Sequence, residues 1–179
     1  MLPTPDTSHV PYERVYEPSE DSFLLLDTLS SDGERQFLRQ TVAVDGDPAP
    51  LVVEVGTGSG VVLAFVHAHA RDIFGTGRVL TAGVDVNAYA CRATVATVRK
   101  AQQDAAAAAD AAPTSTEASP GGPSHAATYL GACMGDLASP WRPNSVDVLI
   151  FNPPYVPTPA LPVRPEGFDD AAAPPQQQP

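Results

Sequence analysis

Four short apolar runs divide this chain, and each is followed closely by a polar or glycine-rich segment. The runs span residues 51–55, 79–84, 127–132 and 146–151. Their length and continuous apolar character are typical of buried strands. In open α/β sheets, ligands bind at the carboxyl ends of the strands, and each polar segment falls at such an end. The expected fold is therefore α/β, with a Rossmann-like sheet flanked by helices.

The first run contains Glu54 and leads directly into a glycine-rich turn, Gly56-Thr57-Gly58-Ser59-Gly60. Glycines at alternate positions let the backbone turn sharply and approach a ligand closely. No lysine follows in the position that a phosphate-cradling loop requires, so NTP hydrolysis is not indicated. The apolar stretch that begins at Val61 predicts a helix as far as about Ala70.

Asp85 ends the second run, where an acid is placed to bind the hydroxyls of a ribose. The same acid could cap the helix that is expected to start near Asn87, and the two roles are compatible. The third run is followed by Gly135-Asp136-Leu137.

Asn152-Pro153-Pro154-Tyr155 follows the last run directly. The two prolines fix their own backbone and bias the preceding residues to extended geometry. This stiff loop presents an amide side chain beside an aromatic ring, which suits the holding of a planar NH2 group. The alternative is that the prolines only terminate the strand.

Together these segments make the chain resemble the HemK-like S-adenosylmethionine-dependent methyltransferases, which methylate the glutamine of the Gly-Gly-Gln motif in translation release factors. The greatest similarity is to the catalytic subunit of the eukaryotic release-factor glutamine methyltransferase. The resemblance covers roughly residues 10–160 and is carried by residues 15–29, 54–62, 135–137 and 151–156, with Asp85. The 15–29 segment is far more specific to this branch than Asn-Pro-Pro-Tyr, which adenine-N6 DNA methyltransferases also contain.

The resemblance implies S-adenosylmethionine as the cofactor and assigns a role to each matching residue. Glu54 and Gly56 would lie beside the methionine moiety, Asp85 would hold the ribose hydroxyls, and Asp136 with Leu137 would hold the adenine. The full set of implied cofactor contacts is Ser22, Glu54, Gly56, Gly58, Asp85, Asp136, Leu137 and Asn152.

The implied catalytic residues are Asn152, Pro153 and Tyr155. The side-chain oxygen of Asn152 and the carbonyl oxygen of Pro153 would accept hydrogen bonds from the target amide, and Tyr155 would stack on it. Positioning of the amide would supply the larger part of the catalysis.

Charge and composition limit the other possible functions. The net charge is −11, with 21 acidic against 10 basic residues, which argues against sequence-independent nucleic-acid binding. The two cysteines form no C-x-x-C motif, and we expect no metal site. We expect His67 and His69 to be ordinary surface or edge residues. No secretory signal or membrane span is visible, so the expected location is the cytoplasm, with the nucleus as an additional location.

The chain is expected to contain one methyltransferase domain over residues 15–160. Residues 1–14 should form a loose arm, residues 101–126 a low-complexity insertion, and residues 161–179 a disordered tail rich in proline, alanine and glutamine. Residues 19–29 predict a helix with Ser19 as N-cap and two acids, Glu20 and Asp21, in its first turn. Pro113 should end the helix that starts near Asn87.

Members of the family continue beyond Asn-Pro-Pro-Tyr with strands that complete a seven-stranded sheet, so this chain looks truncated at its C-terminal side. An incomplete sheet would expose an apolar edge. The family's eukaryotic catalytic subunit also pairs with a small zinc-binding activator, which covers an exposed edge of its sheet. In this chain, the strand over residues 127–132 is expected to form the corresponding edge. Three functions remain open: a protein-glutamine methyltransferase, an adenine-N6 nucleic-acid methyltransferase, and a non-catalytic product that binds the cofactor or a partner.

Overall fold

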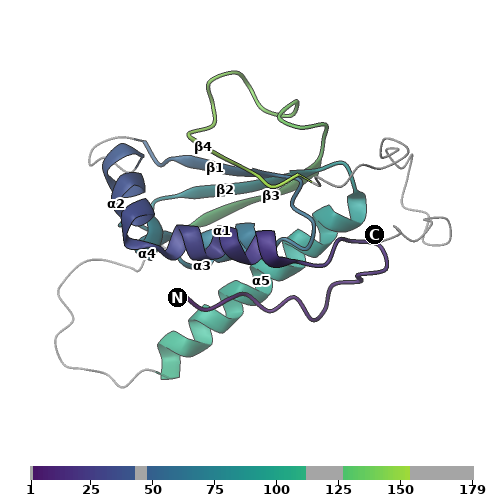
Figure 1. The fold of residues 1–179 in the computed structure, drawn as a ribbon, viewed down its shortest axis with the longest axis horizontal. Helices are drawn as coiled ribbons and strands as arrows, with labels where there is room; N and C mark the ends of the chain where they lie inside the picture. Colours follow the sequence, from purple (N-terminus) through teal and green to yellow (C-terminus); the bar gives the residue numbers. More distant parts are fainter. Residues whose placement is uncertain (1, 43–47, 112–126, 154–179) are drawn as a thin grey trace.

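A four-stranded parallel sheet forms the centre of the molecule (Figure 1). The computed structural model describes residues 2–42, 48–111 and 127–153. The strands are β1 (Leu51–Val55), β2 (Leu80–Asp85), β3 (Thr128–Met134) and β4 (Val148–Phe151), and their order is β3-β2-β1-β4. All four predicted strands are present, and the predicted α/β class is confirmed.

The strand register brings the carboxyl ends of all four strands to one edge of the sheet. Val55 of β1 pairs with Val84 of β2 on one side and with Phe151 of β4 on the other. Asp85, the last residue of β2, pairs with Met134, the last residue of β3. The segments that follow the four strands therefore start side by side.

Among the described residues, five helices accompany the sheet: α1 (Glu20–Ser30), α2 (Asp32–Thr41), α3 (Val61–Ala68), α4 (Ala70–Phe74) and α5 (Ala88–Ala111). In Figure 1, α1, α3 and α5 run along the same face of the sheet. The largest core cluster lies on this face, where Val62 and Phe65 of α3 join Val52 and Ile150 of the sheet. The described part of α5 extends to Ala111, and Pro113, which is expected to end this helix, lies outside the described residues.

The opposite face of the sheet is covered by the segment between β3 and β4, which has no helix or strand (Figure 1). Trp141 and Val146 from this segment pack against Val53 and Val84, among other buried residues of β1 and β2. On β4, Leu149 and Phe151 are 55% and 48% exposed. The segment therefore covers the centre of this face and leaves apolar side chains of the edge strand β4 accessible.

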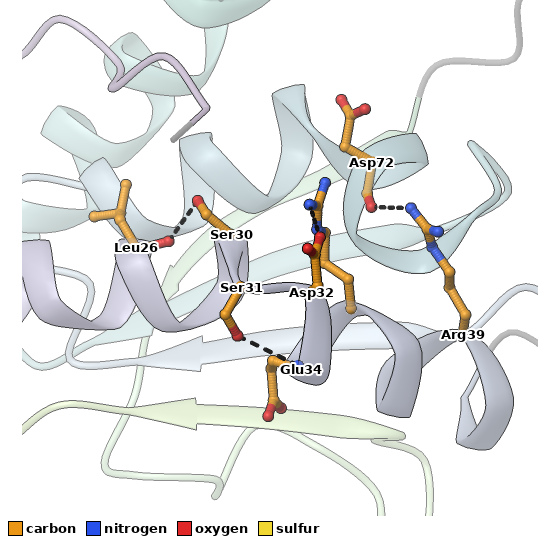
Figure 2. Close-up of polar contacts among 8 residues, drawn as sticks. Leu26, Ser30, Ser31, Asp32, Glu34, Arg39 and Asp72 are labelled. Atoms are coloured by element: carbon orange, nitrogen blue, oxygen red, sulfur yellow. Dashed lines mark hydrogen bonds and ion pairs between the residues drawn. The ribbon is translucent and has the colours of Figure 1, made fainter.

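Helix α2 was not predicted from the sequence, because Leu38 is its only buried residue and no apolar stripe marks it. Polar contacts define it instead (Figure 2). The Ser31 hydroxyl accepts a hydrogen bond from the Glu34 backbone N–H at 3.3 Å and so caps the helix. Arg39 donates to the Asp72 carbonyl oxygen of α4 at 2.5 Å, which ties the two helices together.

The N-terminal segment before α1 contains no helix or strand in its described part, but it is packed against the domain. Val10 and Val15 are buried against Ala90 and Ala93 of α5. Asn87 also donates a side-chain hydrogen bond to the Arg14 carbonyl oxygen at 2.8 Å. This packing differs from the loose arm expected for residues 1–14, because two isolated valines form no periodic pattern that a sequence would reveal.

His67 is buried, with only 4% of its surface exposed, so the expectation of a surface or edge position is wrong for this residue. Its Nδ1 lies 3.0 Å from the Thr81 hydroxyl of β2, and its Nε2 lies 2.8 Å from the Gln102 side-chain nitrogen of α5. Burial lowers the pKa of His67. Every residue of α3 from Val61 to His67 is buried, and such a helix has no solvent face on which a histidine could lie.

None of the helices in the described ranges combines the length and apolar character that crossing a bilayer requires.

Candidate functional site

The turn after β1 contains three glycines, Gly56, Gly58 and Gly60, which all have positive φ angles. A Cβ atom built on Gly56 or Gly58 would meet no other atom within 4 Å, so these two glycines border open space. A Cβ atom on Gly60 would lie 2.5 Å from the Thr94 Cα atom of α5. The first two glycines therefore leave room for a ligand, whereas the third allows close helix packing.

Two buried threonines of α5 form hydrogen bonds with this turn. Thr94 donates a hydrogen bond to the Thr57 hydroxyl at 2.8 Å, and Thr97 donates to the Ser59 carbonyl oxygen at 2.7 Å. Neither threonine was singled out from the sequence. Their spacing of three residues places them on one face of α5, and this spacing is the only signal that could have indicated a shared role.

Asp85 joins the glycine turn to the start of α5. Its Oδ2 accepts a hydrogen bond from the Gly58 backbone N–H at 3.0 Å, and its Oδ1 accepts one from the Asn87 backbone N–H at 2.8 Å. The residue is 9% exposed. Burial raises the pKa of Asp85, although the backbone N–H donors oppose that shift. The Thr57 side chain also forms a hydrogen bond with this carboxylate, so the glycine turn contacts Asp85 through both its backbone and a side chain.

The cap of α5 is Asn87 itself and not Asp85. The Asn87 side-chain oxygen accepts a hydrogen bond from the Tyr89 backbone N–H at 2.9 Å, which is the usual N-cap arrangement. Asp85 holds the backbone of this capping residue. It therefore supports the helix start indirectly while its carboxylate remains at the strand end.

Glu54 lies in β1, two residues before the glycine turn begins, and is 3% exposed. Its Oε2 accepts a hydrogen bond from the Leu63 backbone N–H at 2.9 Å, within the first turn of α3. Burial is the main cause that raises the pKa of Glu54 well above its usual range; the Leu63 hydrogen bond opposes the shift and the nearby Asp85 charge adds to it. A carboxylate here also interacts favourably with the positive end of the helix.

The end of β3 is linked to that of β2, because Gly135 donates a backbone hydrogen bond to the Asp85 carbonyl oxygen at 3.0 Å. The two residues that follow, Asp136 and Leu137, are both exposed. Leu137 has a φ angle of 49°, in the left-handed region that leucine seldom adopts. The predicted adenine contacts thus project from a short turn beside Asp85.

At the end of β4, the half-buried side chain of Asn152 contacts the first turn of α1. The Asn152 Nδ2 donates a hydrogen bond to Asp21 Oδ2 at 2.9 Å. Ser19 occupies the predicted N-cap position of α1, but its hydroxyl makes no cap and donates instead to Asp21 Oδ1 at 2.6 Å. Ser22 is half-buried in the same turn. Pro153 is exposed, and Tyr155 lies outside the described residues.

The predicted residues therefore gather in two groups along one edge of the sheet. One group contains Gly56, Gly58 and Asp85, which are directly hydrogen-bonded or adjacent, with Asp136 and Leu137 attached through Gly135. The other contains Asn152 and the first turn of α1 with Ser22. The sequence indicates only a helix-dipole role for Asp21, because its contact with Asn152 has no local signal.

Two hollows are present in the described part of the molecule. One, of about 420 Å³, lies beside α2, and the other, of about 610 Å³, lies between α5 and β3. None of the predicted site residues lines either hollow. Within residues 2–42, 48–111 and 127–153, no cluster of three His, Cys, Asp or Glu side chains is arranged to hold a metal ion.

Comparison with known proteins points to methyltransferases. The chain is 32% identical to Methyltransferase HEMK2 of Mus musculus over 178 residues, which cover 96% of this chain and 64% of the mouse protein. It is also 32% identical to the eRF1 methyltransferase catalytic subunit mtq2 of Schizosaccharomyces pombe over 164 residues, or 88% of this chain and 59% of the yeast protein. Human Methyltransferase HEMK2 is 31% identical over 176 residues, with 95% and 64% of the two chains covered.

This chain thus spans less than two thirds of the length of these relatives. No protein-family model matches it.

Proposed function

We propose that this chain, which is a homologue of the HEMK2 and mtq2 methyltransferases, binds S-adenosylmethionine and supports methyl transfer to the side-chain amide of a glutamine. The observation that carries the proposal is the gathering of Gly56, Gly58, Asp85 and Asn152 at the carboxyl ends of parallel strands. In sheets of this kind, that edge is where nucleotide-like ligands bind.

The residues at the ends of β1 and β2 fit such a cofactor. Gly56 and Gly58 border open space, and the Asp85 carboxylate lies at the end of β2, where it would accept hydrogen bonds from the ribose hydroxyls. Leu137 offers an exposed apolar side chain to the adenine. Glu54, which is buried beneath the turn, would favour the positively charged methionine end, and that charge would in turn favour its ionised form.

The bound cofactor would supply an electrophilic methyl group, and the chain's own task would be to hold the acceptor amide. An amide nitrogen is a poor nucleophile because its lone pair is delocalised. The Asn152 side-chain oxygen and the Pro153 carbonyl oxygen would accept hydrogen bonds from the two N–H groups of the target amide and so fix its orientation. Tyr155, outside the described residues, would stack on the flat amide.

The proposed substrate is the Gly-Gly-Gln glutamine of a eukaryotic translation release factor, and the proposed partner is a small zinc-binding activator. The substrate is supported by the name of the fission-yeast relative, an eRF1 methyltransferase catalytic subunit. The partner is supported by the position of β3 at one edge of the sheet, where Leu130 is 53% exposed. The cytoplasm is the proposed location, with the nucleus as an additional one.

The test is to incubate the full chain, alone and with the activator, with S-adenosylmethionine and a release factor that carries Gly-Gly-Gln. Mass spectrometry should locate one added methyl group on that glutamine. Asn152→Ala should lower the rate by about a hundredfold, the scale for loss of one preorganised polar contact at a reacting centre. The affinity for the cofactor, measured by calorimetry, should change far less.

Gln36→Ala provides a matched control, because Gln36 is an exposed amide on α2 and should leave the rate unchanged. Methylation of adenine in DNA with none on glutamine would favour the nucleic-acid methyltransferase. Cofactor binding without methylation of either substrate would favour a non-catalytic cofactor-binding protein.

A further inference from the structure

Two consecutive side-chain hydrogen bonds connect the start of α1 with the end of β4. Ser19 donates from its hydroxyl to Asp21 Oδ1 at 2.6 Å, and Asn152 donates from Nδ2 to Asp21 Oδ2 at 2.9 Å. Asp21 thus uses one carboxylate oxygen for each neighbour. The second contact joins residues 131 positions apart in the chain, at the residue on which the proposed chemistry depends.

The chemistry of this contact is directional. A carboxylate only accepts hydrogen bonds, whereas an asparagine side chain has one donor end and one acceptor end of nearly equal shape. Only hydrogen-bond partners can decide which way such an amide faces. Because Asp21 can accept but not donate, Asn152 must turn its NH2 end toward α1, and its Oδ1 must point in a different direction.

We propose that Asp21 is a positioning residue for methyl transfer: its carboxylate holds the NH2 end of Asn152 and so keeps Asn152 Oδ1 available to the target amide. This inference rests on the proposed function. Ser19 has a supporting role, because its hydroxyl fixes the other oxygen of the carboxylate. The ordinary role of an acid in the first turn of a helix, to complement the helix dipole, would not require any contact with β4.

The packing of α1 indicates that this contact is not needed to hold the helix in place. Leu26 and Leu29 of α1 are buried in the main core cluster with Val52 and Ile150 of the sheet. The hydrogen bonds from Ser19 and Asn152 lower the pKa of Asp21, the Ser19 bond most, which keeps the acceptor-only form at neutral pH. Removal of the carboxylate should therefore free the Asn152 amide without releasing α1.

Asp21→Asn tests the inference with almost no change in size. An amide at position 21 can donate as well as accept, so both orientations of Asn152 become possible. In the glutamine-methylation assay, kcat should fall between about tenfold and a hundredfold, the range expected for a misplaced reacting group. The KM for the release factor, the affinity for S-adenosylmethionine and the melting temperature should stay close to those of the wild type.

Glu20→Gln is the matched control, since it makes the same acid-to-amide change one position earlier on an exposed side chain. It should leave kcat unchanged. A loss of activity in Asp21→Asn that is accompanied by a lower melting temperature and weaker cofactor binding would assign Asp21 a structural role and overturn the inference.

A spectroscopic measurement tests the contact without any turnover. In ¹⁵N-labelled full-length chain, the side-chain NH2 signal of Asn152 is identified by its loss in Asn152→Ala. This signal should shift in Asp21→Asn and in Ser19→Ala, but not in Glu20→Gln. An unshifted signal in Asp21→Asn would overturn the contact itself.

The two proposals fail in different ways. If Asn152→Ala is inactive while Asp21→Asn keeps full activity, the positioning role of Asp21 is wrong and the proposed function stands. If Asn152→Ala keeps full activity, the proposed function is wrong and this inference falls with it.

Discussion

The two halves of the candidate site differ in how buried their residues are and in how many of their polar groups already have hydrogen-bond partners within the protein. At the ends of β1 and β2, Glu54 and Asp85 are buried and accept backbone hydrogen bonds from α3, the glycine turn and the start of α5. At the ends of β3 and β4, Asp136, Leu137 and Pro153 are exposed, and Asn152 is held through Asp21. The first half is enclosed by its own chain, whereas the second half faces outward.

This difference indicates which residues should control stability and which should control activity. Substitutions in the enclosed half remove contacts within the folded chain, so they should lower the free energy of unfolding as well as ligand affinity. Substitutions in the open half should leave the fold intact and affect ligands alone.

Gly60→Ala should have the largest effect on stability. A Cβ atom at this position would lie 2.5 Å from the Thr94 Cα atom, and the φ angle of 79° is unfavourable for alanine. We expect the free energy of unfolding to fall by about 3 kcal/mol, from overpacking together with backbone strain. Urea denaturation followed by circular dichroism measures this change.

Gly58→Ala is its control, because the φ angle is 51° but no atom lies within 4 Å of the added Cβ. It should cost only about 1 kcal/mol, from backbone strain alone. Equal losses in the two variants would show that contact with α5 does not matter and that the enclosed half is less tightly packed than the structure indicates.

Asp85→Ala should weaken the binding of S-adenosylmethionine by about 1.5–3 kcal/mol, the range for hydrogen bonds to a charged group. It should also destabilise the fold, because the Gly58 and Asn87 backbone N–H groups lose their acceptor. Calorimetry and thermal unfolding measure the two effects. Asp104→Ala, on the exposed surface of α5, should change neither. An unchanged affinity in Asp85→Ala would contradict the ribose assignment.

Glu54 should give a smaller effect that depends on pH. Its pKa is raised in the folded state, so above its ordinary value of 4.5 the folded chain binds more protons than the unfolded chain. The free energy of unfolding should therefore fall as the pH rises from there, until folded Glu54 is fully ionised. Glu54→Gln keeps an acceptor for the Leu63 N–H and should make this decline less steep.

The measurement is urea denaturation of both proteins between about pH 5 and pH 8, a range that begins above the ordinary pKa of glutamate. His67 acts in the opposite direction, because its lowered pKa makes the fold less stable as the pH falls below 6.5. Subtraction of the two curves removes this shared contribution. Parallel curves would mean that burial does not disfavour the Glu54 charge.

Leu137→Asn should have the smallest effect on the fold and still reduce ligand affinity. Asparagine adopts the left-handed conformation more readily than leucine, so stability should stay unchanged or rise by up to about 1 kcal/mol. The proposed adenine contact would be lost, and calorimetry should show weaker binding of S-adenosylmethionine. A clear loss of stability would show that Leu137 supports the fold, as the residues at the ends of β1 and β2 do. Such a result would contradict the division between the two halves.

Much of this architecture was predictable because its signals are local. Continuous apolar runs with polar ends located all four strands, and parallel pairing then required their carboxyl ends to meet. The glycine turn and Asp85 followed from the same pattern. The starts of α1 after Ser19 and of α5 near Asn87 were also predicted.

The features that could not be predicted depend on contacts between distant segments. Asn152 and Asp21 meet across most of the chain, and Val10 and Val15 are buried only because α5 passes beside them. His67 is buried because α3 is covered on all sides, which a two-residue histidine spacing does not reveal. Propensity and periodicity describe neighbours in sequence, so they contain no information on these pairings.

The segment between β3 and β4 has one more consequence, which follows from its composition. It contains Trp141, the single tryptophan of the chain, packed against the sheet face that carries Val53 and Val84. The same segment contains Asp136 and Leu137, the proposed adenine contacts. If S-adenosylmethionine binds at this turn as proposed, the fluorescence of Trp141 should change on binding, so the single indole group offers a direct test of that assignment.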